Sequence, residues 1–192
     1  MAITERVILP VNGSVDEWKD ALTFMIQIIS IQDGHLRTRY GFHTEDKQKI
    51  ELLIGWESIE APKKFQSSPA FQEMLSHIRP VLAAPPNILI IEFKPYAPAE
   101  VVDAPFIQMI TIQQYTSSED DLRDQITKFK DFQGCTGIAS GFSLDDVDGK
   151  EKAFVAAVGW DDLEASEMAT ESMTGFLDGA ESHLVDFKWG FE

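Results

Sequence analysis

Basic side chains alternate along one predicted strand of the chain. His35, Arg37, Arg39 and His43 share one parity along the strand expected from Leu36 to His43, and side chains of one parity point to the same face of a sheet. If that face is turned inward between two sheets, the arginines can hold an anionic substrate or enolate, with Arg39 stabilising the developing negative charge. His35 can move a proton near neutral pH. The pattern therefore predicts His35 and Arg39 as catalytic residues.

Two other interpretations of this strand stay open. Carboxylates at Glu51, Glu92 and Asp186 are available as partners for the basic residues. The same side chains can therefore form a structural ion-pair network that crosses two sheets, or they can line a solvated sheet edge.

A second candidate for proton transfer is His77, in a predicted helix. The buried stripe of that helix is defined by apolar residues at helical spacing, namely Phe71, Met74, Leu75, Ile78 and Leu82. His77 flanks this stripe, so it is predicted to lean over a neighbouring pocket as a general base. The alternative is an exposed helix histidine, and His183 is interpreted as a turn residue before the last strand.

Aromatic residues supply the walls of the predicted pocket. Trp56 shares the parity of Ile50, Leu52 and Ile54, which is expected to face the helices. It is predicted to stack on an aromatic substrate, and the wall is completed by Trp18, Tyr40 and Phe71. Simple core packing explains the same residues.

Several enzyme classes are disfavoured by missing motifs. The sequence has no Gly-rich phosphate loop, no His-Glu-x-x-His, no Gly-x-Ser-x-Gly and no cluster of histidines and carboxylates at metal-ligand spacing. Cys135 is the only cysteine, so no intrachain disulfide can form and a cysteine-based zinc site is not supported. We therefore expect no metal site.

The overall charge limits the partners. Acidic residues outnumber basic ones by 32 to 16, which gives a formal charge of −16 and repels nucleic acid and anionic membranes. No basic leader followed by an apolar run is visible, and no apolar stretch approaches the roughly 20 residues of a membrane span. A cytoplasmic protein is expected, with no nucleic acid or membrane as partner.

An internal repeat positions these residues. Gly55-Trp56-Glu57 is matched by Gly159-Trp160-Asp161, and Glu92-Phe93-Lys94 is matched by Asp186-Phe187-Lys188. The first half reads as strand, helix, strand, strand, helix, strand. The segments are 5–11, 15–29, 36–43, 50–56, 58–82 and 88–94, with Ser14 as helix cap and Glu17 three residues later.

The second half repeats that order. Its segments are 106–113, a helix from 118, a hairpin within 136–160, 163–177 and 184–191. The prediction is an α+β fold of two ferredoxin-like units, residues 1–95 and 106–192, joined by a linker over 96–105. The second hairpin strand is apolar on both parities, so the two antiparallel sheets are expected to pack on each other as an intramolecular barrel.

The repeat and one motif together resemble a known superfamily. Residues 55–61, Gly-Trp-Glu-Ser-Ile-Glu-Ala, and 65–71, Phe-Gln-Ser-Ser-Pro-Ala-Phe, are similar to the antibiotic-biosynthesis monooxygenase and stress-responsive families of dimeric α/β barrels. The resemblance implies both halves of such a barrel in one chain. It also implies functions that range from cofactor-free oxygenases of polycyclic phenols and polyketide cyclases to haem-degrading enzymes and members of no established activity.

Two departures from those families matter. Their members often carry a histidine shortly after the Glu-Ala pair, where this sequence has Pro62-Lys63-Lys64, so a haem or metal role at that position is not supported. The second half lacks the Ser-Pro-x-Phe element. If one half has a working pocket, we expect the first half, with Trp56, to hold it.

The resulting functional prediction is a small-molecule enzyme of secondary metabolism. The expected substrate is an aromatic or polyketide-like compound, transformed by an oxygenase or cyclase reaction without a tightly bound cofactor. The alternative is a non-catalytic stress-responsive barrel. A homo-oligomer is possible in either case.

Overall fold

The first unit contains its four strands in the expected order, and the predicted helical segment 58–82 forms two helices, so the unit has three helices in all. A computed structural model describes residues 1–113, 115–144 and 152–187. The elements of this unit are β1 (Ile3–Pro10), α1 (Val15–Ser30), β2 (His35–His43), β3 (Lys49–Trp56), α2 (Glu60–Gln66), α3 (Pro69–Ile78), the 3₁₀ turn η1 (Arg79–Val81) and β4 (Asn87–Lys94).

The second unit repeats the pattern after a short connecting helix, α4 (Ala99–Val102). Its elements are β5 (Phe106–Ile112), α5 (Glu119–Thr127), the 3₁₀ turn η2 (Lys128–Asp131), β6 (Cys135–Ser143), β7 (Phe154–Trp160), α6 (Leu163–Ser172), α7 (Thr174–Leu177) and β8 (Glu181–Asp186). The loop expected to absorb the length difference between the two hairpins lies largely outside the described residues.

Helix starts follow local side-chain chemistry. The side chains of Ser14 and Glu17 form a reciprocal capping box at the start of α1, as the sequence predicts. At α3, the Ser68 hydroxyl accepts a hydrogen bond from the backbone N–H of Phe71, and Pro69 occupies the first helical position. These caps fix where α1 and α3 begin.

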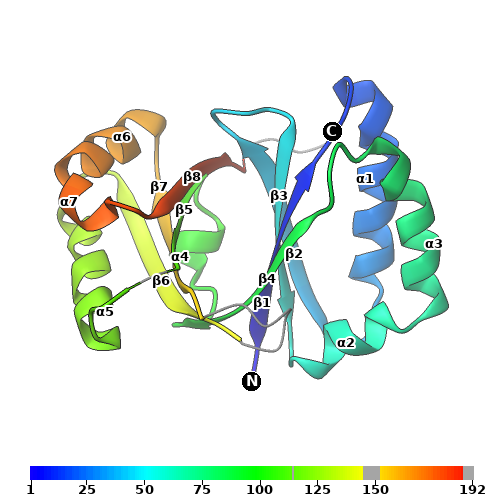
Figure 1. Ribbon diagram of the computed structural model, residues 1–192, viewed down its shortest axis with the longest axis horizontal. Helices are drawn as coiled ribbons and strands as arrows, with labels where there is room; N and C mark the ends of the chain where they lie inside the picture. The colour runs from blue at the N-terminus through cyan, green and yellow to red at the C-terminus, as the bar shows by residue number, and fades with distance from the viewer. Residues whose placement is uncertain (114, 145–151, 188–192) are drawn as a thin grey trace.

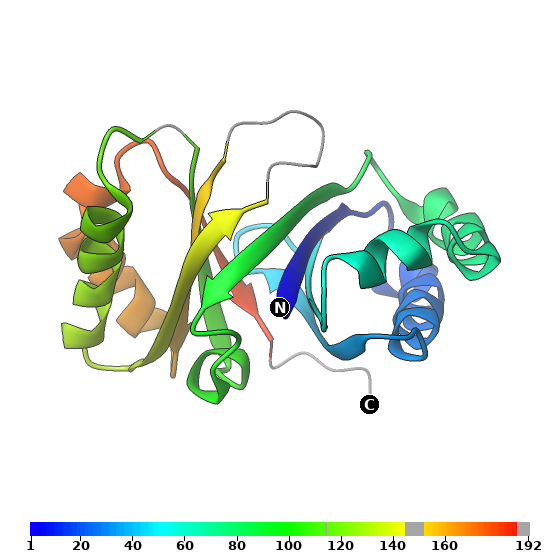
Figure 2. The same cartoon turned by 90° about the horizontal axis from the view of Figure 1, so that it is seen from below.

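The eight strands form one closed antiparallel barrel. Their order around it is β1-β3-β2-β8-β5-β7-β6-β4, so each unit contributes one four-stranded half. The halves meet at two seams, which we call the β2/β8 seam and the β4/β6 seam. Figures 1 and 2 show the helices of the two units on opposite sides of the barrel. The predicted fold, two ferredoxin-like units in one intramolecular barrel, is confirmed.

The two seams are built alike. Gly41 in β2 lies against the backbone of Asp186, and Gly141 in β6 lies against the backbone of Glu92. A Cβ added at Gly141 would come within 1.9 Å of the Glu92 carbonyl oxygen. Only a residue without a side chain permits this approach of the strands.

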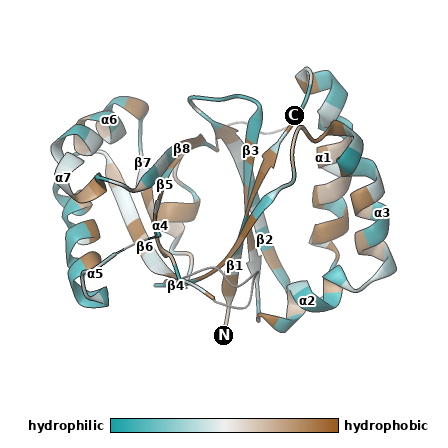
Figure 3. Cartoon of the chain, viewed as in Figure 1, coloured by the Kyte–Doolittle hydropathy of each residue, from teal (hydrophilic) through white to brown (hydrophobic). Residues whose placement is uncertain are grey.

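Apolar residues form three clusters that follow the barrel wall. One lies between the first sheet and α1–α3, one fills the barrel, and one lies between the second sheet and its helices. In β7, Val155 and Ala157 point into the barrel, whereas Phe154 and Trp160 face the helices, as parity predicts. Figure 3 shows the concentration of apolar residues on the strands.

The segment 96–105 between the units was predicted to be only a linker, but it contains a helix that packs into the fold. Val101 of α4 is 2% exposed and packs in the cluster that fills the barrel. The backbone carbonyl of Glu100 accepts a hydrogen bond from the Thr136 hydroxyl. Sequence inspection missed α4 because a helix of four residues has no periodicity to detect.

The described helices are amphipathic and short. The longest, α1, has 16 residues with one buried face. Among the described residues, no helix combines the length and the apolar character needed to cross a bilayer.

Candidate functional site

A cavity of about 70 Å³ lies between the first sheet and α1–α3. Its wall is apolar and partly aromatic, and it includes one ionisable group. The residues that define its character are Glu5, Trp56, Phe65, Phe71, Met74 and Ile78. The rings of Phe65 and Phe71 meet edge to face, with centroids 5.3 Å apart. The arrangement suits an apolar, aromatic ligand.

Glu5 is the polar feature of this cavity. Its carboxylate oxygen Oε2 accepts a 2.8 Å hydrogen bond from the indole Nε1 of Trp56, and the residue is 7% exposed. Burial raises the pKa of Glu5, and the hydrogen bond from Trp56 offsets only part of that effect. A carboxyl group held in this way can exchange a proton closer to neutral pH than a solvated one.

In the second unit, the side-chain amide of Gln108 occupies the position equivalent to that of Glu5. Trp160 Nε1 donates to Gln108 Oε1 at 3.2 Å, and Gln108 Nε2 donates to the hydroxyls of Thr170 and Ser182. Gln108 lines a polar cleft of about 350 Å³ that also reaches Glu45. The two units therefore present different chemistry beneath their helices.

The structure brings together only part of the predicted site. Trp56 and Phe71 line the cavity of the first unit. Trp18 and Tyr40 belong to the same core cluster but not to the cavity wall, and Trp18 packs against Phe42 with ring centroids 5.5 Å apart. Both tryptophans of the repeat face the helices, as predicted.

His35 does not share a face with the arginines, which corrects the parity argument. A β-bulge between His35 and Arg37 adds one residue to β2. Residues that precede such a bulge point to the opposite face of the sheet from the one that simple alternation predicts. His35 consequently lies edge to face with Trp56, with centroids 5.9 Å apart, and bonds to the Thr38 hydroxyl. Burial lowers the pKa of His35.

His77 lies on the outer side of α3. It is exposed, its ring stacks on Phe24 of α1 with centroids 4.0 Å apart, and its Nδ1 is 3.0 Å from the backbone oxygen of Glu73. It is not among the residues that line the cavity. Because His77 directly precedes Ile78 of the buried stripe, its side chain points to the flank of α3, against the neighbouring helix α1.

Arg37 and Arg39 occupy the inner side of β2, away from the Trp56 cavity. The Arg37 guanidinium lies over the ring of Tyr96 at 5.5 Å and donates to the Ala97 carbonyl. The Arg39 guanidinium lies over the ring of Phe187 at 5.6 Å, and its buried Nε makes no hydrogen bond to the described residues. The predicted pairing of Arg39 with a histidine base is therefore not assembled in this cavity.

An ion-pair network does cross the barrel, but its arginine is one that sequence reasoning missed. Arg6 makes two hydrogen bonds to the Glu51 carboxylate, at 2.7 and 3.0 Å, and a third to the Thr111 hydroxyl of the second unit. His43 Nε2 approaches the same carboxylate at 2.8 Å. Burial opposes ionisation, yet Arg6 and His43 lower the pKa of Glu51 to about 2.

Glu5 and Arg6 carry a signal that was available in the sequence. In β1 the alternation of Ile3, Val7 and Leu9 marks the helix-facing side, and Glu5 interrupts it with a carboxyl group. A charged residue on an apolar parity requires a buried partner or a function. Arg6, on the opposite parity, is 4% exposed.

The titration of Glu5 makes the stability of the chain pH-dependent. Because the folded-state pKa is raised, the folded chain retains a proton that the unfolded chain has lost, and stability falls as pH rises from about 4.5 through the raised value. We expect the wild type to lose stability relative to Glu5→Gln over that window. Urea unfolding of both proteins at several pH values measures the difference, and parallel curves would contradict the assignment.

The barrel, its seams and its two helix layers define the class. The chain has the dimeric α/β-barrel fold, with both ferredoxin-like units fused in one polypeptide. No protein-family model matches the sequence, and no curated protein matches it either.

Solved structures of the same fold span nearly the whole chain. An anthrone oxidase-like protein has a TM-score of 0.70 at 11% identity over 96% of this chain and 90% of its own. A putative monooxygenase from Fusobacterium nucleatum has a TM-score of 0.65 at 12% identity, covering 96% and 91%. A putative monooxygenase from Lactobacillus acidophilus has a TM-score of 0.60 at 10% identity, covering 96% and 92%.

Proposed function

We propose that the first unit is a small-molecule enzyme that abstracts a proton from carbon, with Glu5 as the general base. The observation that carries the proposal is a buried carboxyl group with a raised pKa in an apolar, aromatic-lined cavity. A base of this kind contributes typically 10²–10⁴-fold to rate. The names of the neighbours, putative monooxygenases and an anthrone oxidase-like protein, agree with such chemistry.

Proton abstraction is the step that oxygenation and cyclisation share. The C–H proton next to a carbonyl or aromatic ring passes to the Glu5 carboxylate, while the Trp56 N–H holds the other end of that carboxyl group in place. The electron pair left on the substrate forms an enolate, which can attack a second carbonyl or react with dioxygen. For an anthrone-like methylene, one oxygen atom of a dioxygen molecule becomes the ketone oxygen and the other leaves as water with the two methylene hydrogens, so the substrate supplies all the electrons.

Substrate size sets a condition on this proposal. A cavity of about 70 Å³ is smaller than the roughly 150 Å³ that accommodates benzene. An aromatic or polyketide-like substrate must therefore displace α2 and α3, which form its outer wall. Ligand binding is expected to separate Phe71 from Phe65.

The small cavity favours a second candidate function. A stress-responsive barrel without catalysis needs no room for a substrate, and the Trp56 indole already satisfies one oxygen of Glu5. In that case Glu5 is a structural partner of Trp56, and no compound is turned over.

Turnover of a panel of anthrone-like and polyketide substrates under air tests the proposal. We expect Glu5→Gln to lower kcat by about 10²-fold or more while leaving the fold intact, because an amide cannot accept the proton. Glu73→Gln removes an exposed carboxylate from α3 and serves as the matched control. His77→Ala tests the alternative base predicted from sequence.

The outcomes separate the candidates. Loss of turnover in Glu5→Gln alone supports the proposal, and loss in His77→Ala alone transfers the role to His77. Indifference of the wild type to every substrate favours the non-catalytic barrel.

A further inference from the structure

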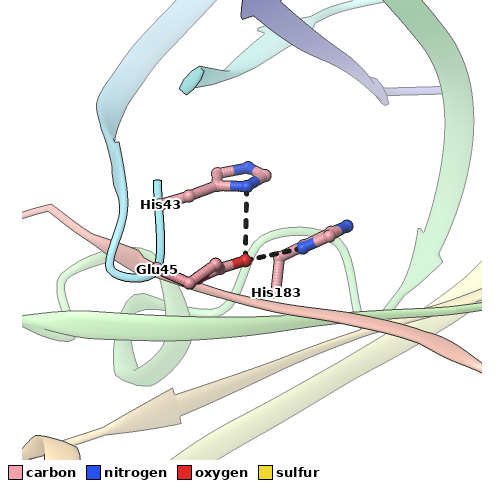
Figure 4. Close-up of side chains that lie close together, drawn as sticks. All are labelled: His43, Glu45 and His183. Carbon is pink, nitrogen blue, oxygen red and sulfur yellow. Dashed lines mark hydrogen bonds and ion pairs between the residues drawn. The ribbon is translucent and has the colours of Figure 1, made fainter. Parts of the chain in front are cut away.

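Three potential metal ligands meet at the β2/β8 seam, away from the Glu5 cavity. His43 ends β2, Glu45 follows in the loop to β3, and His183 lies within β8. Figure 4 shows both imidazole rings turning a nitrogen toward one oxygen of Glu45. Among the described residues, these three are the group of histidines and acids close enough to share an ion.

The distances are close to those of a coordination sphere. Glu45 Oε1 is 2.8 Å from His183 Nδ1 and 3.6 Å from His43 Nδ1, and the three ligand atoms lie within 4.8 Å of one another. In a tetrahedral zinc site with bonds of about 2.0–2.1 Å, neighbouring ligand atoms are about 3.3 Å apart. The two imidazole rings are stacked with centroids 4.6 Å apart, so a tetrahedral site requires rotation of the rings to bring both Nδ1 atoms onto a common point.

His43 is already oriented as a ligand. Its Nε2 is bonded to the Glu51 carboxylate, which only accepts, so Nε2 is the donor and the neutral form of the ring presents the Nδ1 lone pair toward Glu45. The side chain is 1% exposed, and Nδ1 is a buried nitrogen without a hydrogen bond among the described residues. A carboxylate behind the far nitrogen is the usual support of a metal-bound histidine.

We propose that His43, Glu45 and His183 bind a first-row transition-metal dication such as Zn²⁺, independently of the chemistry proposed for Glu5. Two imidazoles and one carboxylate are the donor set of open zinc and non-haem iron(II) sites. The formal charge of −16 on the chain adds a general attraction for cations.

The site borders a polar cleft through Glu45, whereas His43 and His183 are not among the residues that line that cleft. Glu45 also lines the polar cleft of about 350 Å³ beneath α6, together with Gln108, Ser166, Thr170 and Ser182. Three protein ligands leave at least one coordination position for water or for an oxygen-bearing ligand. A polar cleft of this volume lies within the range of small-molecule sites.

The other seam supplies an internal comparison. By strand pairing, Ser143 of β6 stands where His43 stands in β2, and Leu89 of β4 stands where His183 stands in β8. The same backbone arrangement therefore exists in this chain with a hydroxyl and an aliphatic group in place of the imidazoles. His183→Leu introduces the side chain that the equivalent position already carries.

Calorimetric titration of the untagged, EDTA-treated chain with Zn²⁺ tests the site. Absorption of bound Co²⁺ in the visible range reports the coordination geometry in parallel. We expect one ion per chain and a rise in Tm with Zn²⁺. His183→Leu and Glu45→Gln should each weaken binding by at least about 100-fold, since loss of mere supporting hydrogen bonds costs about 10–100-fold.

Two controls make the result specific. His77→Leu removes an exposed histidine on α3 and should bind Zn²⁺ as the wild type does. The Glu45 side chain is 48% exposed, so Glu45→Gln is expected to retain the fold. Circular dichroism checks this. The proposal is overturned by the absence of saturable binding, or by binding that His183→Leu and Glu45→Gln leave unchanged.

Discussion

Replacing Arg6 with methionine is expected to lower the free energy of unfolding by about 3–5 kcal/mol, the cost of leaving a buried charge without its partner. Glu51 is fully buried, and Arg6 supplies two of its hydrogen bonds. Methionine preserves much of the volume, so the loss reports the polar interactions of Arg6 rather than its packing. The same change removes the bond to Thr111, which links the two units. Urea unfolding at pH 7 measures the effect.

The second unit provides the matched control. Met109 and Val155 occupy the positions equivalent to Arg6 and Glu51, by the pairing of β1 with β3 and of β5 with β7. The double variant Arg6→Met/Glu51→Val is therefore expected to recover at least half of the loss, since apolar residues often replace a buried ion pair without penalty. If the two changes add instead, Glu51 does not depend on Arg6.

The second large effect is expected for Gly141→Ala at the β4/β6 seam. The new methyl group would overlap the backbone carbonyl of Glu92, which lies 1.9 Å from the Cβ position. The conflict is with backbone, so no side-chain rotation relieves it and the strands must separate. Overpacking typically costs about 1–3 kcal/mol, and we expect this substitution at or above the upper end of that range.

Two further glycines test the explanation. Gly41→Ala at the β2/β8 seam meets the backbone of Asp186 and should be destabilising for the same reason. Gly175→Ala in α7 meets nothing within 4 Å and should be neutral or slightly stabilising, since alanine favours a helix. Thermal unfolding of the three variants compares them directly, and equal Tm values would exclude backbone conflict.

The fold was predictable because its signals are local and repeated. Gly55-Trp56 and Gly159-Trp160 mark equivalent strand ends, and the parity of β7 predicts two buried faces from seven consecutive residues. A period of two along a strand depends only on neighbouring residues. Because both faces of this strand are apolar, the barrel could be predicted without knowing which strand edges of the two units pair.

The sites were less predictable because they depend on edges and irregularities. The bulge before Arg37 adds one residue to β2 and moves His35 to the other face of the sheet. No residue type in that part of the sequence indicates a bulge. The contact between Glu45 and His183 spans 138 positions and arises only when β2 meets β8. The interpretation of His183 as a turn residue was wrong, because His183 lies within β8. Sequence spacing also gave no sign that His43, Glu45 and His183 come together.

The β2/β8 seam has a consequence for synthesis on the ribosome. Its partner strand, Glu181–Asp186, is the last strand of the described chain, and the other edge of the first unit, β4, is paired only once β6 has been made. Until then the nascent first unit carries two open strand edges and leaves inner apolar residues such as Leu53, Ile91 and Phe93 uncovered, features that favour pairing between chains. Slow translation of the second half would prolong that exposure, so chaperone demand in the cell is expected to depend on how quickly the second unit follows the first.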